Sequence, residues 1–236
     1  MIRQAHAILM LLLGVTVLRT AFTDVYLRYV KEGLRPLLIG VGVVLIVAAA
    51  ATFWYEWRRP APENQPPPQE GHREPRVSWL LAVPVLALIL VAPPALGAYT
   101  VDRAGSAIQQ PAGFPALAAG DPVPLTVGDY AARAVYDHGR SLAGRTVKVT
   151  GFVTLGKGGE PMLARLTLSC CAGDAQPIKV GLEGKVPAGL RPNAWLEVTG
   201  AFSARRTADP INRAPIPYLA VTEAKPVPEP RNPYES

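Results

Sequence analysis

The hydrophobic residues of this chain are concentrated in three blocks within its first hundred positions. The second block, LLIGVGVVLIVAAAATFWY, contains no charge and shows no polar face, unlike a helix in the core of a soluble domain. Each block is long enough to cross a hydrocarbon core of about 30 Å as a helix rising about 1.5 Å per residue. The pattern therefore predicts three transmembrane helices, at about residues 5–23, 37–55 and 78–99.

The first block is the least regular of the three. Arg19 interrupts it, and the run after Arg3, AHAILMLLLGVTVL, resembles the apolar region of a signal peptide. No small-x-small cleavage pattern follows this run, whereas two further apolar blocks come after it in the chain. We therefore expect a retained helix whose Arg19 lies near an interface, where its side chain reaches the lipid headgroups.

Aromatic residues and prolines mark the ends of the other two blocks. Trp54, Tyr55 and Trp57 close the second block and Trp79 opens the third, where amphipathic rings favour the membrane boundary. The third block also contains prolines, which membrane helices tolerate when the freed carbonyls find other partners. They are Pro84, Pro93 and Pro94. The last turn of the third helix is therefore predicted to be kinked or unwound.

Polar connections separate the membrane region from one folded domain. The first two helices occupy residues 1–57, and the loop at 58–77 is rich in Pro, Gln and Glu, which cannot support a packed core. After the third helix, residues 100–124 are predicted to be a flexible linker and 125–228 to be a domain of ordinary size. The proline-rich residues 229–236 are predicted to be a disordered tail.

Within this domain the spacing of apolar residues changes from helical to alternating after Gly139. TVGDYAARAVYD begins with a Thr126–Asp129 variant of the capping box and predicts one short amphipathic helix. Five β-rich runs follow, namely TVKVTGFVT, MLARLTLSC, PIKVGL, AWLEVTGAFS and YLAVTEAK. One helix and five short strands predict a small, mainly-β, OB-like five-stranded barrel.

Gly151 and Gly200 lie inside strands, where glycine marks a bend or bulge. The Gly/Pro loop before the fourth strand is too short for the helix usual there.

The composition agrees with a membrane protein and predicts its orientation. The chain is 49% hydrophobic and only 18% charged, and its mean hydropathy is +0.18. With three spans, the amino terminus and the loop at 58–77 share one side. That side carries Arg3, Arg58, Arg59, Arg73 and Arg76, and the other carries Arg28, Lys31, Arg35 and Arg103. Five basic residues against four predict an internal amino terminus and an extracytoplasmic carboxyl domain.

The net charge of +6 does not predict a nucleic-acid partner. Part of it belongs to the flanks of the predicted spans. The basic residues of the β-rich domain are scattered rather than arranged in a stripe. They are Arg165, Lys179, Arg205 and Arg206. The lipid bilayer is the partner that the charge and hydropathy pattern predict.

The only two cysteines, Cys170 and Cys171, are adjacent in the stretch LTLSCCAGDAQP. Neighbouring side chains on a strand point to opposite faces, so both thiols can meet one ligand only if the backbone turns there. Gly173 and Asp174 make such a turn plausible. A soft metal ion, bound by Cys170, Cys171 and Asp174, is one interpretation, and it is the only cofactor that the sequence suggests.

Three other interpretations of the pair remain open. The first is a strained vicinal disulfide. The second is a redox or thiol-transfer role, which needs a depressed thiol pKa although no base is adjacent. In the third, one thiol is a small core hydrophobe, the other packs under the turn, and Asp174 binds backbone amides in an Asx-type turn.

No other pattern in the chain predicts an activity. The sequence shows no nucleophile paired with a base and no phosphate-binding loop, because GKGGE lacks the Lys-Ser/Thr ending. The protein is therefore predicted not to be an enzyme. Trp195 and Phe202 could stack against a ligand, although aromatic residues alternating in an apolar strand more often belong to the core.

The chain resembles the bacterial permease-subunit family typified by YcgQ. The resemblance is carried by VTGFV, LSCCAGDAQP and WLEVTG in the β-rich domain, and by YVKEGLRPLLIGVGVVL leading into the second span. Its most specific part is the vicinal pair with Asp174, Ala175 and Pro177. One departure is that the loop at 58–77 holds only one histidine, His72, where the family's loops are often rich in them. A metal-sequestering role of this loop is therefore not expected.

The resemblance implies a multi-pass protein of the bacterial plasma membrane that acts beside a multi-span permease. The first hypothesis is accordingly an accessory subunit for transport, with the β-rich domain outside the membrane. The alternative hypothesis is a membrane-tethered protein that binds or senses a metal or thiol through its vicinal cysteines. The family has no assigned reaction, so the resemblance implies a location and a membrane partner but no activity.

Overall fold

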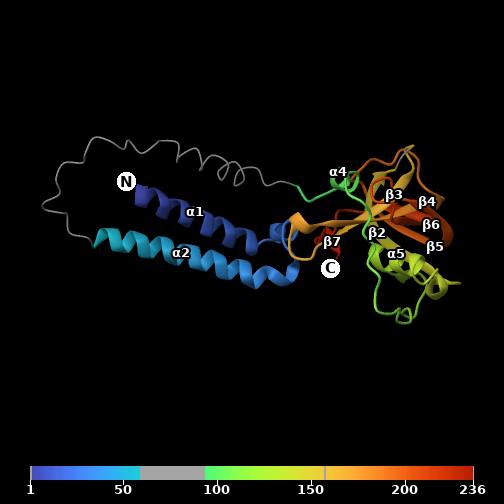
Figure 1. Ribbon diagram of the computed structural model, residues 1–236, viewed down its shortest axis with the longest axis horizontal. Helices are drawn as coiled ribbons and strands as arrows, with labels where there is room; N and C mark the ends of the chain where they lie inside the picture. The colour runs from blue at the N-terminus through green and yellow to red at the C-terminus, as the bar shows by residue number, and fades with distance from the viewer. Residues whose placement is uncertain (1, 59–93, 157, 236) are drawn as a thin grey trace. The chain divides into compact units, whose positions relative to one another are not determined.

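The computed structural model describes residues 2–58, 94–156 and 158–235, which divide into two compact units. The first unit comprises residues 1–26 and 32–94, and the second comprises residues 27–31 and 95–236. Figure 1 shows the helices α1 and α2 of the first unit and the strands of the second. Residues 27–31, which precede α2 in the chain, belong to the same unit as the strands.

The first unit contains two helices that lie side by side, α1 (Ile2–Ala21) and α2 (Arg35–Trp57). Both agree closely with the first two predicted spans. By length and composition, one helix of the described residues, Glu32–Tyr55, could cross a membrane, and His6–Ala21 is a shorter apolar helix. Three transmembrane helices are therefore not confirmed, and most of the predicted third one lies outside the described residues.

Small residues occupy the buried positions of α1 and α2. The buried positions of the two helices, among those described, are Ala7, Gly14 and Ala21 of α1, and Gly42 and Ala49 of α2. Within each helix they are seven residues apart, so they lie on one face. A Cβ atom added to Gly42 would come 2.7 Å from the Leu18 side chain. Small residues let helix backbones approach closely, as they do in membrane helix pairs.

The second unit is built around a closed five-stranded barrel. Its strands are β2 (Thr146–Leu155), β3 (Pro161–Thr167), β4 (Gln176–Gly184), β5 (Trp195–Ala208) and β6 (Pro215–Pro226). They pair in the order β2-β5-β6-β4-β3, and a β2–β3 pairing closes the ring. The β4–β6 pair is parallel, and the other four pairs are antiparallel. The predicted five-stranded barrel is confirmed.

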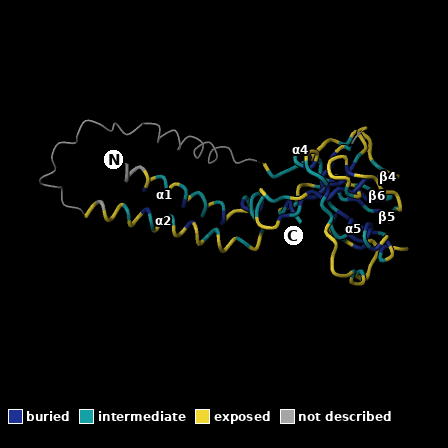
Figure 2. The backbone as a smooth tube through the Cα atoms, viewed as in Figure 1, coloured by how far each residue is buried: buried dark blue, intermediate teal, exposed yellow. Residues whose placement is uncertain are grey.

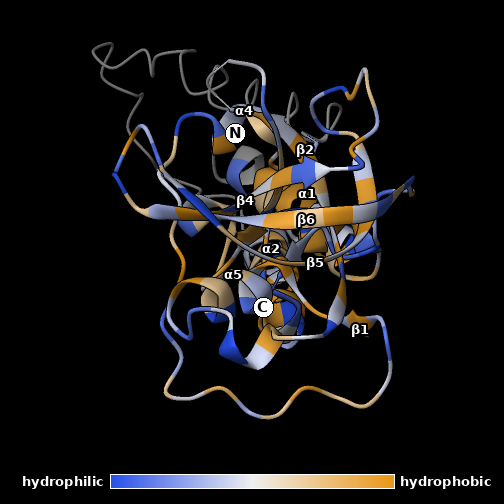
Figure 3. Ribbon diagram, turned by 90° about the vertical axis from the view of Figure 1, so that its right-hand side faces the viewer, coloured by the Kyte–Doolittle hydropathy of each residue, from blue (hydrophilic) through white to orange (hydrophobic). Residues whose placement is uncertain are grey.

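One helix, α5 (Val127–Val135), precedes the barrel strands and closes one side of the core. Its predicted cap is present, since the Thr126 hydroxyl accepts a hydrogen bond of 2.9 Å from the Asp129 amide. The buried face of α5 joins apolar residues from the barrel strands, and the Tyr130 hydroxyl donates to the Tyr218 carbonyl at 2.6 Å. Figure 2 shows the buried positions concentrated in this unit, and Figure 3 shows hydrophobic residues along β6.

The segments on either side of the barrel contain short ordered elements. The predicted third span ends too late, because residues 94–97 are not helical and Ala98–Val101 form α4, which belongs to the barrel unit. The linker predicted at 100–124 ends in β1 (Val123–Pro124), parallel to β2. Within it, the Ser106 amide donates to Asp209 at 3.0 Å. These hydrogen bonds hold the linker against the barrel.

The prediction of a disordered tail at 229–236 is wrong for its end. Tyr234–Glu235 form β7, which pairs in parallel with β3, and Tyr234 is only 4% exposed. The Glu235 carboxylate accepts hydrogen bonds from the Val127 and Gly128 amides at 2.8 and 2.9 Å, at the start of α5. A carboxylate there satisfies helix amides that have no partner within the helix, so it fixes the tail.

Candidate metal centre

The two cysteines lie in the turn between β3 and β4, and the backbone does change direction there. Ala172–Asp174 form a short 3-10 helix, and Cys171 precedes it in an extended conformation. This turn brings the two adjacent thiols to one side. The two Sγ atoms and a carboxylate oxygen of Asp174 all lie within 4.8 Å of one another. The structure therefore brings together the three residues that the sequence predicted as metal ligands.

Backbone amides orient the Asp174 carboxylate. One of its oxygens accepts a hydrogen bond from the Ser169 amide at 2.9 Å, and the other accepts one from the Cys170 amide at 2.7 Å. The Asp174 amide donates in return to the Cys171 sulfur. Hydrogen bonds to the charged form, first of all from the Cys170 thiol, lower the pKa of Asp174 to about 2. Asp174 is therefore an ionised carboxylate at neutral pH.

The Cys170 thiol is protonated for the same reason. Its hydrogen bond to the Asp174 carboxylate, and next to it the one to Cys171, raise the pKa of Cys170 to about 12. A thiol needs a depressed pKa to act as a nucleophile at neutral pH. The environment of Cys170 thus does not favour the redox or thiol-transfer interpretation. A metal ion would instead have to displace this proton, because the ligand is the thiolate.

The packing interpretation of the cysteines is only half correct. Asp174 does bind backbone amides, as that interpretation expected. However, Cys170 is exposed and Cys171 is half-buried, so neither is a core hydrophobe, and both are free thiols rather than a vicinal disulfide. Two thiols and a carboxylate that reach solvent could together hold one ion, with a fourth tetrahedral position left for water or another ligand.

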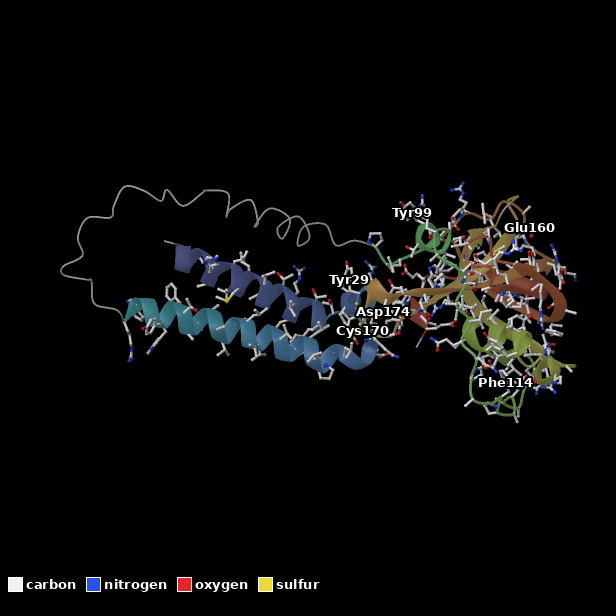
Figure 4. All side chains as sticks on the ribbon, in the orientation of Figure 1. Tyr29, Tyr99, Phe114, Glu160, Cys170 and Asp174 are labelled. Carbon is white, nitrogen blue, oxygen red and sulfur yellow. The ribbon has the colours of Figure 1, made fainter. Side chains whose placement is uncertain are left out.

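A segment from the amino-terminal region pairs with this turn, which the sequence did not predict. We call residues 27–31 the connector, because they lie between α1 and α2 in the chain. The Ala172 amide donates to the Tyr29 carbonyl at 2.7 Å, and the Lys31 amide donates to the Cys170 carbonyl at 3.0 Å. Val30 and Cys171 form an antiparallel bridge. Figure 4 labels Tyr29, Cys170 and Asp174 in this region. No local pattern signals a pairing across 140 residues of sequence.

The other predicted site residues shape the barrel rather than the turn. Gly200 lies at a β-bulge between β5 and β6, as predicted. Gly151 pairs with β5 one residue before the pairing of β2 with β3 begins at Phe152, and an added Cβ atom would come 2.8 Å from the Ala164 carbonyl oxygen. Pro177 is buried in β4 opposite Leu166.

The predicted aromatic residues are occupied by contacts within the domain. The Trp195 ring packs edge-on against Phe152, with 5.5 Å between their centroids, and the Arg165 guanidinium lies 4.9 Å from its centre. Phe202 is partly buried against the barrel core. Neither ring lies in the cysteine turn, and both are partly buried against the clusters of core residues.

A separate cavity of about 660 Å³ lies between the β2–β3 and β5–β6 loops, and no residue of the turn lines it. Its wall contains the ion pair of Lys179 and Asp209, 2.8 Å apart. Burial raises the pKa of Asp209, but hydrogen bonds from Lys179 and from the Ile211 and Ser106 amides lower it overall. Because Lys179 also donates to the Ala104 carbonyl at 2.8 Å, these contacts fasten the linker to β4 and to the β5–β6 loop.

The comparison with known proteins concerns the second unit. Residues 119–235 match the family model described as the DUF1980 C-terminal domain. No curated protein and no solved structure matches the chain. The match agrees with the resemblance to YcgQ-like proteins, and it includes the barrel, the cysteine turn and β7. The carboxyl-terminal domain of this chain is therefore similar to the DUF1980 C-terminal domain family.

Proposed function

We propose that this chain is a membrane-anchored protein that binds a soft metal ion through Cys170, Cys171 and Asp174. The observation that supports the proposal is the convergence of two sulfurs and a carboxylate oxygen within 4.8 Å of one another on a turn that reaches solvent. Thiolates select zinc or cuprous ions, and a carboxylate completes such sites. The amide hydrogen bonds to Asp174 orient this ligand before the ion arrives.

The test is Zn²⁺ binding to the full chain, purified in mild detergent and dialysed to equilibrium against a range of free Zn²⁺. The wild type is expected to take up one ion per chain. The Cys170→Ala, Cys171→Ala double variant is expected to lose it, whereas Ser169→Ala, which keeps its amide and all three ligands, is expected to bind like the wild type. Equal uptake by the double variant and the wild type would contradict the proposal.

The anchor that we propose has three spans, and the connector supports this number. The connector and the barrel belong to one unit, so they lie on the same side of any membrane that the chain crosses. If α2 crosses once after the connector, the chain must cross back before Ala95. The predicted third block is the sequence that supplies this crossing, and it would end before Ala95, which already belongs to the barrel unit.

We further propose that the barrel is extracytoplasmic, following the distribution of basic residues. Ile211 is 48% exposed in the β5–β6 loop and suits a label. An Ile211→Cys variant, in a chain with both native cysteines replaced by serine, is expected to react with a membrane-impermeant maleimide in intact cells. Reaction only after lysis would place the barrel inside and refute the orientation.

A role as accessory subunit of a multi-span permease is the second candidate. The observation that favours it is the apolar surface of the helix pair away from its seam of small residues. This surface fits either lipid or the helices of a membrane partner. Purification in mild detergent is expected to recover a multi-span protein with this chain at fixed stoichiometry. Recovery of the chain alone under those conditions would count against the role.

A further inference from the structure

The connector pairs with the cysteine turn through its backbone. Two backbone hydrogen bonds hold it there, from Ala172 to Tyr29 and from Lys31 to Cys170, at 2.7 and 3.0 Å. The bridge between Val30 and Cys171 lies between these two bonds. This is a single-bridge form of the backbone pairing by which an extended peptide adds to a sheet, here within one chain.

A second contact fixes the start of the connector. The Tyr234 hydroxyl donates to the Arg28 carbonyl at 2.9 Å and accepts from the Leu96 amide at 3.0 Å. Leu27, the first residue of the connector, is only 3% exposed. The connector is therefore held at both ends, by β7 near Arg28 and by the cysteine turn at Lys31.

The residues that hold the connector are also the residues that carry the ligands. Cys170 presents its carbonyl to Lys31 and its thiol to Asp174. Cys171 is bridged to Val30 through its backbone, and its sulfur accepts from the Asp174 amide. The connector and Asp174 thus both form hydrogen bonds to the backbone of the turn that carries the two thiols. A shift of the backbone at Cys170 or Cys171 would therefore alter both the position of the ligands and the pairing with the connector.

We propose that docking of the connector and binding of a metal ion at Cys170, Cys171 and Asp174 are coupled, so that each strengthens the other. The inference rests on the proposed metal-binding function and names the regulation of that site. Coupling of this kind is reciprocal, because the factor by which docking raises ion affinity equals the factor by which the ion favours docking. Only three residues separate Lys31 from Arg35, where α2 begins.

The test compares two substitutions at one position in the full chain in detergent. Lys31→Pro removes the amide that donates to Cys170, whereas Lys31→Ala keeps this amide and removes only the side chain. Zn²⁺ is expected to bind about tenfold more weakly to Lys31→Pro than to the wild type, as coupling between sites typically provides. Binding to Lys31→Ala is expected to equal that of the wild type. Tyr234→Phe, which removes the hydroxyl bound to Arg28, is expected to weaken Zn²⁺ binding in the same direction.

Hydrogen exchange measures the reciprocal effect. Saturating Zn²⁺ is expected to slow exchange of the Lys31 amide in the wild type by about the same factor of ten, and to leave it unchanged in the Cys170→Ala, Cys171→Ala variant. Equal Zn²⁺ affinity of Lys31→Pro and Lys31→Ala would overturn the coupling and leave the metal site intact. Absence of Zn²⁺ binding to the wild type would overturn the metal site and the coupling together.

Discussion

The helix pair and the barrel bury opposite kinds of side chain. In α1 and α2, the buried positions among the described residues are alanines and glycines, while large apolar side chains are exposed, such as Val44 at 66% and Leu37 at 64%. In the barrel the large side chains are inside, with Leu163 and Leu219 fully buried. Figure 2 shows this contrast, with exposed and intermediate positions along the helices and buried positions along the strands.

The contrast agrees with the proposal that the helix pair lies in lipid and the barrel in water. Water drives large apolar side chains into a core, as in the barrel. Lipid gives no such drive between helices, so close packing of small residues decides which faces meet, as in the seam of α1 and α2. The pair of thiols lies on the barrel unit, at the turn that binds the connector.

The largest expected effect comes from shortening one leucine in each region. Leu163→Ala should lower the free energy of unfolding of the barrel by about 2–5 kcal/mol, because it leaves a cavity in the core. Leu37→Ala, on the exposed surface of α2, should change this free energy of unfolding by less than about 0.5 kcal/mol. Urea titration of the full chain in mild detergent, followed by near-ultraviolet circular dichroism, measures both. Equal losses would remove the contrast between the two units.

A smaller effect is expected at the seam of the helix pair. Gly42→Leu should cost about 1–3 kcal/mol of helix association, because an added side chain meets Leu18, whereas nothing lies within 4 Å of a Cβ atom at Gly40. Spin labels at Ile8 and Phe53, both exposed, report the separation of the helices in a chain without cysteines. The distance distribution should broaden in Gly42→Leu and stay narrow in Gly40→Leu. A broad distribution in both variants would argue against the seam.

The smallest effect concerns the charge at the turn. Because the pKa of Cys170 is raised to about 12, its thiol should stay protonated up to at least about pH 10. The hydrogen bond from the Cys170 thiol to the Asp174 carboxylate stabilises the folded turn fully below the ordinary thiol pKa of about 8.5. Its contribution is lost as the pH rises toward 12. Asp174→Asn should bring thiolate absorbance to a lower pH. Ionisation of Cys170 at the same pH in both proteins would refute the role of Asp174.

Asp174 has the opposite dependence on pH. Its pKa is lowered to about 2, so its contribution to the turn is complete above the ordinary carboxyl pKa of about 3.9 and is lost as the pH falls toward 2. The turn should therefore hold its geometry across the neutral range. Metal binding should strengthen with rising pH there, since the ion displaces the proton of Cys170.

Much of the barrel could be predicted from sequence because its signals are local. Alternation of apolar residues located all five strands, and the Thr126 cap located α5. The cysteine turn was also predictable, because Gly173 and Asp174 favour a change of direction directly after the thiols.

The connector and the tail could not be predicted, because their partners are distant in the sequence. Val30 and Cys171 are 141 positions apart, and Glu235 reaches α5 from the far end of the domain. The tail also contains prolines, which favour a prediction of disorder. The face on which α1 and α2 meet could not be predicted for a different reason. Because α2 is apolar on every face, its small residues do not distinguish the face that contacts α1 from the others.

X-ray absorption of the full chain loaded with Zn²⁺ tests the central claim most directly. The account predicts two sulfur ligands at about 2.3 Å and at least one oxygen ligand at about 2.0–2.2 Å, with the sulfur signal lost in Cys170→Ala, Cys171→Ala. A bound ion surrounded only by oxygen and nitrogen, with an unchanged spectrum in the double variant, would contradict it.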